Sequence, residues 1–420
     1  MYNGLELTDE ELSMLKGEQG EGRKKAMELL VGLGRIFGAK RMVRVRSVQI
    51  SGISYKTIGD AGLELIRDFS SFTKVFDDVA AVMNPAGMDL EAWKEMGIPE
   101  VFAMKQLEIV GLLKAMGVQP LCTCTPYHAG SVPHYGEHIA WAESSAVIYA
   151  NSVFGARTNR EGGPSALAAA ITARTPEYGL HIDNERVPTA VFDLAGCRNL
   201  VLNNPHFTLT VLGYLIGKKA GGGVPYITGL ADIVPRSFIT SDMLKAMGAG
   251  MAASGAVALY HFEGITPEWA WAKEQLEKAS SEANKTAIYR ITEEELLEAN
   301  KQMRGNGKQP ELIAFGCPHL SNEELEKIAH YLEGKRRINP HIRFWVFTSR
   351  AVGSRCTSEI ETIRRFGNVF FDTCMVVSPV ETLFKTIGVD SSKAYRYIPT
   401  LGNVEALLRP TEEWLKMIAE

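Results

Sequence analysis

Apolar residues recur along this chain with two different periods, which together predict a mixture of helices and strands. Thr8 followed by Glu11 has the spacing of a helix capping box, and it predicts a short helix that ends at Gly17. A second helix is expected at about 22–37. Residues 43–50 (VRVRSVQI) then alternate apolar and polar positions, as a half-buried strand does. The N-terminal part is therefore expected to combine helices with a sheet.

The next segments continue this mixture. A loop of small residues at 51–62 follows the predicted strand and gives way to a helix at 60–68. A further strand is expected at 79–83, and a helix at 99–116. Strands separated by helices favour parallel pairing, because a parallel connection has to cross the sheet.

The C-terminal third has the clearest pattern. Short apolar runs at 312–316, 344–348 and 369–372 alternate with amphipathic stretches, and Ser321 with Glu324 forms a capping box at the first of these helices. The second of these helices is expected to run through residue 364. Strand and helix alternating at this spacing predict right-handed βαβ units. The predicted fold class is α/β, with parallel sheets flanked by helices.

The middle of the chain is richer in small residues. Helices are expected at 165–173 and 247–258, a glycine loop at 221–223, and two helix starts within 263–297. No internal repeat, low-complexity tract or long linker separates these segments. Residues 1–420 are therefore expected to form two to three interleaved or tightly packed α/β subdomains.

Composition narrows the class of protein. The 420 residues are 45% hydrophobic and 22% charged with a net charge of −4, which is ordinary for a globular protein and gives no support for nucleic-acid binding. No uninterrupted apolar run approaches the roughly 20 residues that span a bilayer, and the N-terminus lacks the pattern of a signal peptide. We expect a cytoplasmic protein that binds neither membrane nor nucleic acid.

Six cysteines are too few for a disulfide scaffold, so their positions must indicate their role. Cys317 directly follows one predicted strand, Cys374 lies two residues after another, and Cys124 closes an apolar run before Pro126. Ligands gather at the carboxyl ends of parallel strands. Three thiols from three strand ends predict one site, and an iron–sulfur cluster with an open iron is one candidate for it.

Other roles for the thiols stay open. A single buried cysteine is more often a small core residue, and a zinc site usually has ligand pairs two to four residues apart, which this set lacks. A zinc-stabilised or metal-free binding or assembly module is therefore the alternative outside the enzymes. Cys122 could replace Cys124 as a ligand. Cys197, expected before a strand, and Cys356, expected at a helix start, are interpreted as structural.

Polar residues between 127 and 164 are the second indication of a functional site. Three histidines, at 128, 134 and 138, are more simply explained as solvated loop residues than as metal ligands. Glu143 and Ser144 stand in an apolar stretch, where a carboxylate needs a partner or a shifted pKa. Arg157 and Arg160 precede a helix start and suit a carboxylate or phosphate, although surface placement is equally compatible. The loop at 348–350 is a further anion candidate.

Five segments also resemble one known family, the aconitase X family, and the match runs over essentially the whole chain. The segments are Ser51–Lys56 (SGISYK), Thr123–Tyr127 (TCTPY), Asn151–Pro164 (NSVFGARTNREGGP), Gly316–His319 (GCPH) and Asp372–Cys374 (DTC). The resemblance implies an iron–sulfur hydro-lyase, with Cys124, Cys317 and Cys374 as cluster ligands. Three thiolates suit a four-iron cluster with one open iron but do not exclude a two-iron cluster.

Members of this family have a large catalytic part and a small swivel part. A chain of this length has room only for the large part, so the resemblance implies a separate small subunit that supplies the catalytic base. The implied reaction is dehydration of (R)-mevalonate 5-phosphate to trans-anhydromevalonate 5-phosphate in an archaeal-type mevalonate pathway, the alternative substrate being cis-3-hydroxy-L-proline. The expected substrate-binding residues are Gly52, Ile53, Ser54, Asn84, Pro85, Glu143, Ser144, Arg157, Asn159 and Arg160.

Overall fold

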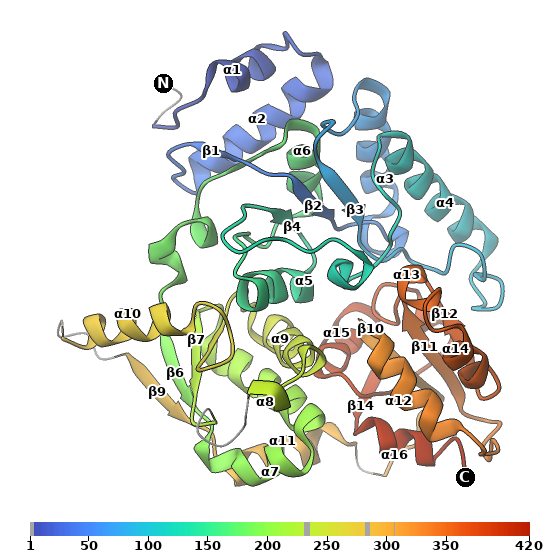
Figure 1. The fold of residues 1–420 in the computed structure, drawn as a ribbon. Coiled ribbons are helices and arrows are strands. Elements are labelled where there is room, and N and C mark those ends of the chain that lie inside the picture. The colour runs from blue at the N-terminus through green and yellow to red at the C-terminus, as the bar shows by residue number, and fades with distance from the viewer. Residues whose placement is uncertain (1–3, 231–235, 282–285, 306) are drawn as a thin grey trace. The chain divides into compact units, whose positions relative to one another are not determined.

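The computed structural model describes residues 4–230, 236–281, 286–305 and 307–420 (Figure 1). The chain divides into two compact units that follow one another in sequence, unit 1 at Met1–Arg186 and unit 2 at Val187–Glu420. Each unit is built around parallel strands with helices packed on them. Among the described residues, no helix has the length and apolar character needed to cross a membrane.

Unit 1 contains a parallel sheet and a separate antiparallel pair. The sheet has the order β3-β2-β4, formed by Ala80–Met83, Ser47–Ile50 and Ala140–Trp141. The pair joins β1 (Met42–Arg44) to β5 (Arg174–Pro176). The single strand predicted at 43–50 was therefore wrong, because it is split between β1 and β2.

The reason for this split is visible in the residues themselves. Val43 and Val45 are buried at odd positions, whereas Val48 and Ile50 are buried at even positions. Since side chains alternate between the two faces of a strand, this change of phase requires a break in the strand.

The helices of unit 1 mostly follow the predicted pattern. They are α1 (Asp9–Lys16), α2 (Glu21–Ile36), α3 (Tyr55–Phe72), α4 (Glu100–Ala115), α5 (Ser144–Tyr149) and α6 (Gly163–Thr172). The capping box at α1 is confirmed, with the Glu11 amide donating to Thr8 Oγ1 at 3.3 Å and the Thr8 amide donating to Glu11 Oε2 at 2.9 Å. Helix α3 is longer than predicted and is kinked at Gly59, where φ is 57°.

The first helix is also fastened to the last strand of unit 1. The buried guanidinium of Arg174 in β5 donates from Nη2 to Glu10 at 2.7 Å and from Nε to Glu11 at 2.8 Å. Both carboxylates belong to α1, so this contact joins the first helix of unit 1 to its last strand.

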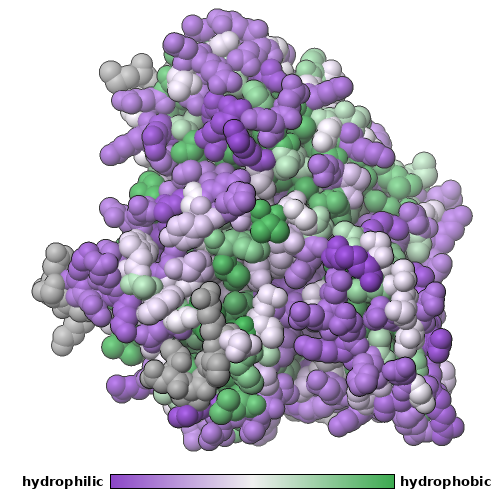
Figure 2. Space-filling view, viewed as in Figure 1, coloured by the Kyte–Doolittle hydropathy of each residue, from purple (hydrophilic) through white to green (hydrophobic). Residues whose placement is uncertain are grey.

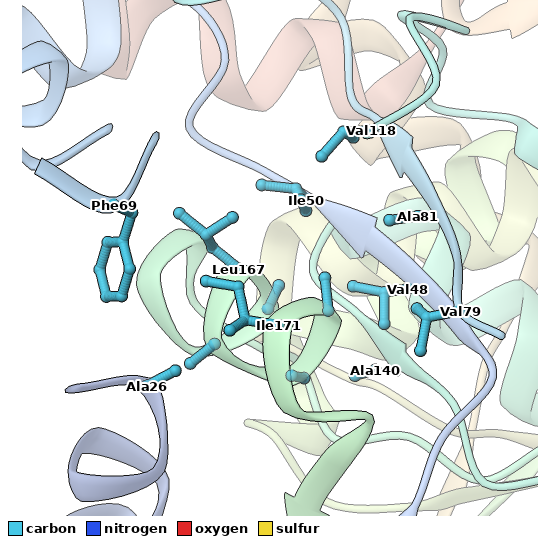
Figure 3. Packing of buried hydrophobic residues seen from close by; sticks show 14 of the residues in the cluster. Ala26, Val48, Ile50, Phe69, Val79, Ala81, Val118, Ala140, Leu167 and Ile171 are labelled. Carbon is cyan, nitrogen blue, oxygen red and sulfur yellow. The ribbon is translucent and has the colours of Figure 1, made fainter. Parts of the chain in front are cut away.

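The core of unit 1 lies between the parallel sheet and α6 (Figure 3). Leu167 and Ile171 of α6 belong to the same buried cluster as Val48 and Ile50 of β2, and Ala26 of α2 lies on the other side of α6. Helix α6 is apolar all round, as expected for a helix buried on every side. Burying each large side chain of this kind contributes about 1.5–3 kcal/mol.

Unit 2 begins with a four-stranded parallel sheet of order β8-β7-β6-β9. Its strands are Ala190–Asp193 (β6), Pro225–Thr228 (β7), His261–Phe262 (β8) and Ala287–Arg290 (β9). Its helices are Arg198–Asn203 (α7), Pro205–Ala220 (α8), Ser241–Gly255 (α9), Trp269–Ser281 (α10) and Glu293–Met303 (α11). Cys197 follows β6 and precedes α7, so its predicted place before a strand was wrong.

A five-stranded parallel sheet of order β12-β11-β10-β13-β14 completes unit 2. The strands are Leu312–Leu320 (β10), Arg343–Thr348 (β11), Asn368–Phe370 (β12), Thr386–Val389 (β13) and Glu405–Leu408 (β14). The helices are Asn322–Leu332 (α12), Arg350–Gly353 (α13), Thr357–Arg364 (α14), Ser392–Gly402 (α15) and Thr411–Lys416 (α16). The single helix expected through residue 364 is thus two helices. The α/β fold class with parallel sheets flanked by helices is confirmed.

Candidate functional site

The carboxyl ends of the strands in unit 1 carry most of the predicted substrate residues. Gly52, Ile53 and Ser54 follow β2, and Asn84 and Pro85 follow β3, its parallel neighbour. The Asn84 amide donates to the Ile50 carbonyl at 2.9 Å, which continues the ladder to the edge of the sheet. The two loops therefore leave the same edge side by side.

The segment that carries Cys124 lies on the other side of β3. The amide of Gln119 donates to Ala81 at 2.8 Å, and the amide of Thr123 donates to Met83 at 3.1 Å. Cys122 has a positive φ of 43°, so this segment is not a regular strand. Cys124 is 4% exposed and stands at the same sheet edge as the two loops.

A buried glutamine on β2 holds this cysteine segment. Gln49 is 0% exposed, and its Nε2 donates to the Thr123 carbonyl at 3.0 Å. Its Oε1 and the Oδ1 of Asn84 are buried acceptors with no hydrogen-bond partner among the described residues. Buried acceptors of this kind favour a ligand that brings donors, such as a hydroxyl group.

Glu143 and Ser144 follow β4, on the far side of β2. Glu143 caps α5, accepting from the Ala146 amide at 2.8 Å and from the Ser145 hydroxyl at 2.6 Å. Ser144 Oγ donates to its other oxygen at 3.1 Å. These bonds satisfy a carboxylate that is only 8% exposed, so capping α5 is one role that Glu143 certainly performs.

Gly163, near the end of the segment 151–164, packs against the loop after β2. A Cβ at Gly163 would lie 2.8 Å from the carbonyl oxygen of Ser51, so only glycine allows this approach. Asn159 is 9% exposed and binds the turn at 178–180, donating to Tyr178 O and accepting from Leu180 N, both at 2.9 Å. Arg160 is exposed.

Arg157 is held within unit 1 by two partners. Its Nη1 donates to the His181 carbonyl at 3.2 Å, and its Nη2 is paired with the Asp183 carboxylate. Beside it, the Nδ1 atoms of His138 and His181 lie 2.9 Å apart. Burial lowers the pKa of His181 to about 3, and this keeps its imidazole neutral. His138 is thus part of a histidine pair rather than a free loop residue.

Unit 2 brings together the other two candidate cysteines. A hydrogen bond with the Cys317 thiol lowers the pKa of Cys374, and the backbone amides of Val376 and Val377 and the cation of Lys393 act in the same direction against burial. Cys317 is 3% exposed and Cys374 is 5% exposed. Both thiols are therefore buried, and the hydrogen bond between them lowers the pKa of Cys374 toward the thiolate form.

Cys317 lies inside β10 and not directly after a strand, which corrects the prediction. β10 continues to Leu320, but its register against β11 shifts between Phe315 and Leu320. Gly316 has a φ of 105°, and a Cβ there would lie 2.1 Å from the Phe347 carbonyl oxygen. Cys317 therefore lies in an irregular part of β10, where the regular pairing with β11 is interrupted.

Three side chains fix the segments around this thiol pair. His319 Nε2 lies 2.7 Å from the Thr373 carbonyl oxygen, which joins the two cysteine segments. Arg350 donates to Asp372 from Nε at 2.8 Å, and its Nη2 lies 2.6 Å from the same carboxylate. The Arg350 guanidinium is thus paired with a buried aspartate.

The donor chemistry fits an iron–sulfur cluster, because cysteine thiolates are the ligands that such clusters use. Cys317 and Cys374 lie together in unit 2, whereas Cys124 belongs to unit 1. Within the described ranges, no group of three or more His, Cys, Asp or Glu side chains is arranged to hold a metal ion. Two of the three cysteines that were expected as ligands thus lie together in unit 2.

Several polar residues of these segments were missed by the sequence analysis. Gln49, Gln106, His319 and Asp372 are 1% exposed or less. The first three are hydrogen-bonded to backbone carbonyls of the segments described above, and Asp372 is bonded to the Arg350 guanidinium. They could have been found in the sequence as polar residues at positions where the pattern predicts an apolar face, since a buried amide or imidazole must have hydrogen-bond partners.

Polar and thiol side chains at the carboxyl edges of parallel sheets define an α/β protein with an enzyme-like site. Models of the first, second and third domains of aconitase X match residues 4–184, 188–301 and 310–419. The chain belongs to the aconitase X family.

Named relatives agree with this membership. The phosphomevalonate dehydratase large subunit of Methanothermobacter thermautotrophicus is 46% identical, covering 99% of this chain and 98% of the relative. The cis-3-hydroxy-L-proline dehydratase of Hypocrea jecorina is 30% identical, covering 94% of this chain and 66% of the relative. The holo-form crystal structure of Thermococcus kodakaraensis aconitase X matches with a TM-score of 0.85 and 38% identity, covering 99% of this chain and 100% of that one.

Proposed function

We propose that this chain is the large subunit of a cytoplasmic hydro-lyase that dehydrates (R)-mevalonate 5-phosphate to trans-anhydromevalonate 5-phosphate. The observation that carries the proposal is the 46% identity to a phosphomevalonate dehydratase large subunit over nearly the full length of both chains. The hydroxyproline relative is less similar and is matched over 66% of its length. The reaction removes a proton from C2 and hydroxide from C3, which leave together as water.

Cys124, Cys317 and Cys374 would hold an iron–sulfur cluster, for which a four-iron form with one open iron is the proposed type. When bound, such a cluster supplies Lewis-acid chemistry to a substrate carboxylate and hydroxyl. The buried thiols of Cys317 and Cys374, which are hydrogen-bonded to each other, support the two ligands from unit 2. The place of Cys124 beside the loops after β2 and β3 supports the third.

The chain's own polar groups would bind and orient the substrate. The proposed residues are Gly52, Ile53, Ser54, Asn84, Pro85, Glu143, Ser144, Arg157, Asn159 and Arg160. The unpartnered acceptors of Gln49 and Asn84 suit the substrate's hydroxyl groups. Arg157 and Arg160 are the proposed residues for the anionic end; Arg160 is exposed, and Arg157 is paired with Asp183.

A small swivel-domain subunit is the proposed partner, and it would supply the base that takes the C2 proton. The large-subunit name of the archaeal relative supports a second chain. If the large chain alone, with its cluster intact, turned over substrate at the full rate, this part of the proposal would be wrong.

The function is tested with the anaerobically purified large chain and the swivel-domain protein of the same genome. We expect water loss from (R)-mevalonate 5-phosphate and no comparable turnover of cis-3-hydroxy-L-proline. The opposite preference would assign the alternative substrate. A complex that transforms neither would contradict the hydro-lyase assignment.

The cluster is tested separately by its colour. Replacing Cys124, Cys317 or Cys374 by serine should abolish the broad visible absorbance of the protein. Cys197→Ser and Cys356→Ser are matched controls, because both residues are buried and lie outside the proposed ligand set. Colourless native protein with one zinc per chain would contradict the cluster and favour the zinc-stabilised module.

A further inference from the structure

One buried amide in unit 1 lies where the pattern of α4 calls for an apolar residue. The inward face of this helix is formed by Ala103, Gln106, Ile109 and Leu113, each 0% exposed. Three of the four are apolar, and Gln106 stands among them. An amide buried in such a place is costly unless its donor and acceptor are both satisfied.

Gln106 is hydrogen-bonded to the two loops at the sheet edge and to the first residue of α3. Its Oε1 accepts from the Tyr55 amide at 3.0 Å and from the Gly87 amide at 2.8 Å. Its Nε2 donates to the Ile53 carbonyl at 2.9 Å. One side chain therefore bonds the loop that follows β2 and the loop that follows β3, and all three bonds are made to backbone atoms.

The two loops are also in close contact at this point. A Cβ at Gly87 would lie 2.7 Å from Ser54 Oγ and 2.8 Å from Gln106 Oε1, so glycine allows the loops to approach. The bonds to Gln106 fix the loops in direction as well as in distance, because an amide accepts and donates in one plane.

We propose that Gln106 is a positioning residue for substrate binding. It holds Gly52, Ile53 and Ser54 in register with Asn84 and Pro85, so that groups from both loops meet the substrate in one geometry. The inference rests on the proposed function, which assigns these loops to the substrate pocket. Displacement of binding groups by about 1 Å can cost on the order of 100-fold in rate, so a residue outside the pocket can control it.

The solvent-exposed face of α4 provides a position for a control substitution. Val101, Met104 and Leu107 are 73%, 60% and 38% exposed, and hydrophobic side chains gather over α3 and α4 in Figure 2. Met104→Gln is therefore a control on the same helix with the same polar substituent.

The kinetic test uses the complex of large and small subunits with its cluster loaded. We expect Gln106→Leu to raise KM for (R)-mevalonate 5-phosphate at least tenfold while visible absorbance per chain stays at the native level. Gln106→Glu, which can still accept from Tyr55 and Gly87 but cannot donate to Ile53, should recover part of the loss. Ile109→Val, a buried change one turn away, and Met104→Gln should stay within twofold of native.

The second measurement does not depend on activity. Hydrogen–deuterium exchange of the large chain should show faster exchange of the Tyr55 and Gly87 amides in Gln106→Leu, and native protection in Ile109→Val. Native exchange in Gln106→Leu, or KM values within twofold of native in both Gln106 variants, would overturn the proposal. If the native complex transforms neither substrate, the proposed function fails and the exchange result still decides whether Gln106 fixes the loops.

Discussion

His319 donates a hydrogen bond from Nε2 to the carbonyl oxygen of Thr373 at 2.7 Å, and both residues are 0% exposed. The bond joins β10, which carries Cys317, to the segment after β12, which carries Cys374. The spacing of the two thiols is therefore set by the surrounding backbone as well as by their own contact.

Removing this bond should loosen the thiol pair. We expect His319→Ala to lower iron content per chain at least twofold and the free energy of unfolding by about 1–3 kcal/mol, because a buried carbonyl loses its donor. His319→Gln can still donate and should retain more iron. Iron analysis and urea unfolding measure the two effects. His330→Ala, at a side chain that is 89% exposed, is the control. Native iron content in His319→Ala would show that the bond is dispensable.

Lys245 is the central cation of a buried cluster in unit 2. Its Nζ lies 3.0 Å from Asp242 and is paired with Glu324, and both Lys245 and Asp242 have side chains 2% exposed. Burial lowers the pKa of Lys245, but the two carboxylates outweigh it and leave the pKa raised. The ammonium therefore stays charged.

We expect Lys245→Met to reduce the free energy of unfolding by about 3–5 kcal/mol, because the buried Asp242 carboxylate and the mostly buried Glu324 carboxylate lose this cation. The exposed pair Lys278–Glu274 gives the control, and Lys278→Met should cost less than about 0.5 kcal/mol. Denaturant unfolding compares the two variants. A loss below about 1 kcal/mol in Lys245→Met would mean that the carboxylates become protonated or hydrated without cost.

Helices α8 and α9 pack so closely that a methyl group does not fit between them. A Cβ at Gly213 would lie 2.2 Å from the backbone oxygen of Met247, and backbone atoms cannot move aside as a flexible side chain can. We expect Gly213→Ala to destabilise the chain by about 1–3 kcal/mol. Gly111→Ala on α4 is the matched change, since nothing lies within 4 Å of its Cβ position. It should stabilise by about 0.5–1 kcal/mol through helix propensity. Equal melting temperatures for both variants would contradict the close packing.

Glu161 makes the stability of unit 1 depend on pH. Burial raises its pKa above the ordinary 4.5, and hydrogen bonds from the Ser165 and Thr175 hydroxyls offset this only in part. The folded chain therefore holds this proton more tightly than the unfolded chain. Its contribution is fully present below pH 4.5 and is lost as pH rises through the higher folded-state pKa.

Glu161→Gln removes this ionisation while keeping a polar group for both hydroxyls. We expect the stability of the variant relative to native to increase as pH rises from about 4.5 toward neutral, measured by urea midpoints at several pH values. Glu28→Gln, an exposed change, should show no such trend. A constant difference between native and Glu161→Gln across this range would contradict the raised pKa.

Local patterns were enough to predict the fold class. The capping boxes at Thr8 and Ser321 and the short apolar runs of β10, β11 and β12 depend on neighbouring residues, so the sequence displays them directly. The strand at 43–50 was mispredicted because the buried positions change from odd to even numbers after Val45. The prediction treated residues 43–50 as one continuous alternation of apolar and polar side chains. The end of β10 was missed because the strand was predicted from the apolar run at 312–316, whereas the backbone continues to Leu320.

The candidate site could be predicted only in part from the sequence, because some of its contacts join residues that are far apart along the chain. Strand-end placement pointed to Cys124, Cys317 and Cys374, although Cys317 lies inside β10 and the segment before Cys124 is not a regular strand. Gln106 bonds Ile53 across 53 residues of sequence, and Gln49 bonds Thr123 across 74. Such partners become visible only once the sheet order is known. Strand-end placement left an iron–sulfur cluster as one candidate beside zinc and a structural role, and only the family resemblance selected the cluster and implied a substrate.

The contact of Arg174 with Glu10 and Glu11 has a consequence for synthesis. The partners are separated by 163 and 164 residues, so α1 can be fastened only after nearly all of unit 1 has left the ribosome. At about 5–20 residues per second, this takes roughly 8–30 s, during which the apolar face of α2 lacks α6, the helix against which it packs, and α1 lacks its contact with Arg174. The nascent chain is therefore expected to recruit chaperones before residue 174 emerges and to release them soon afterwards.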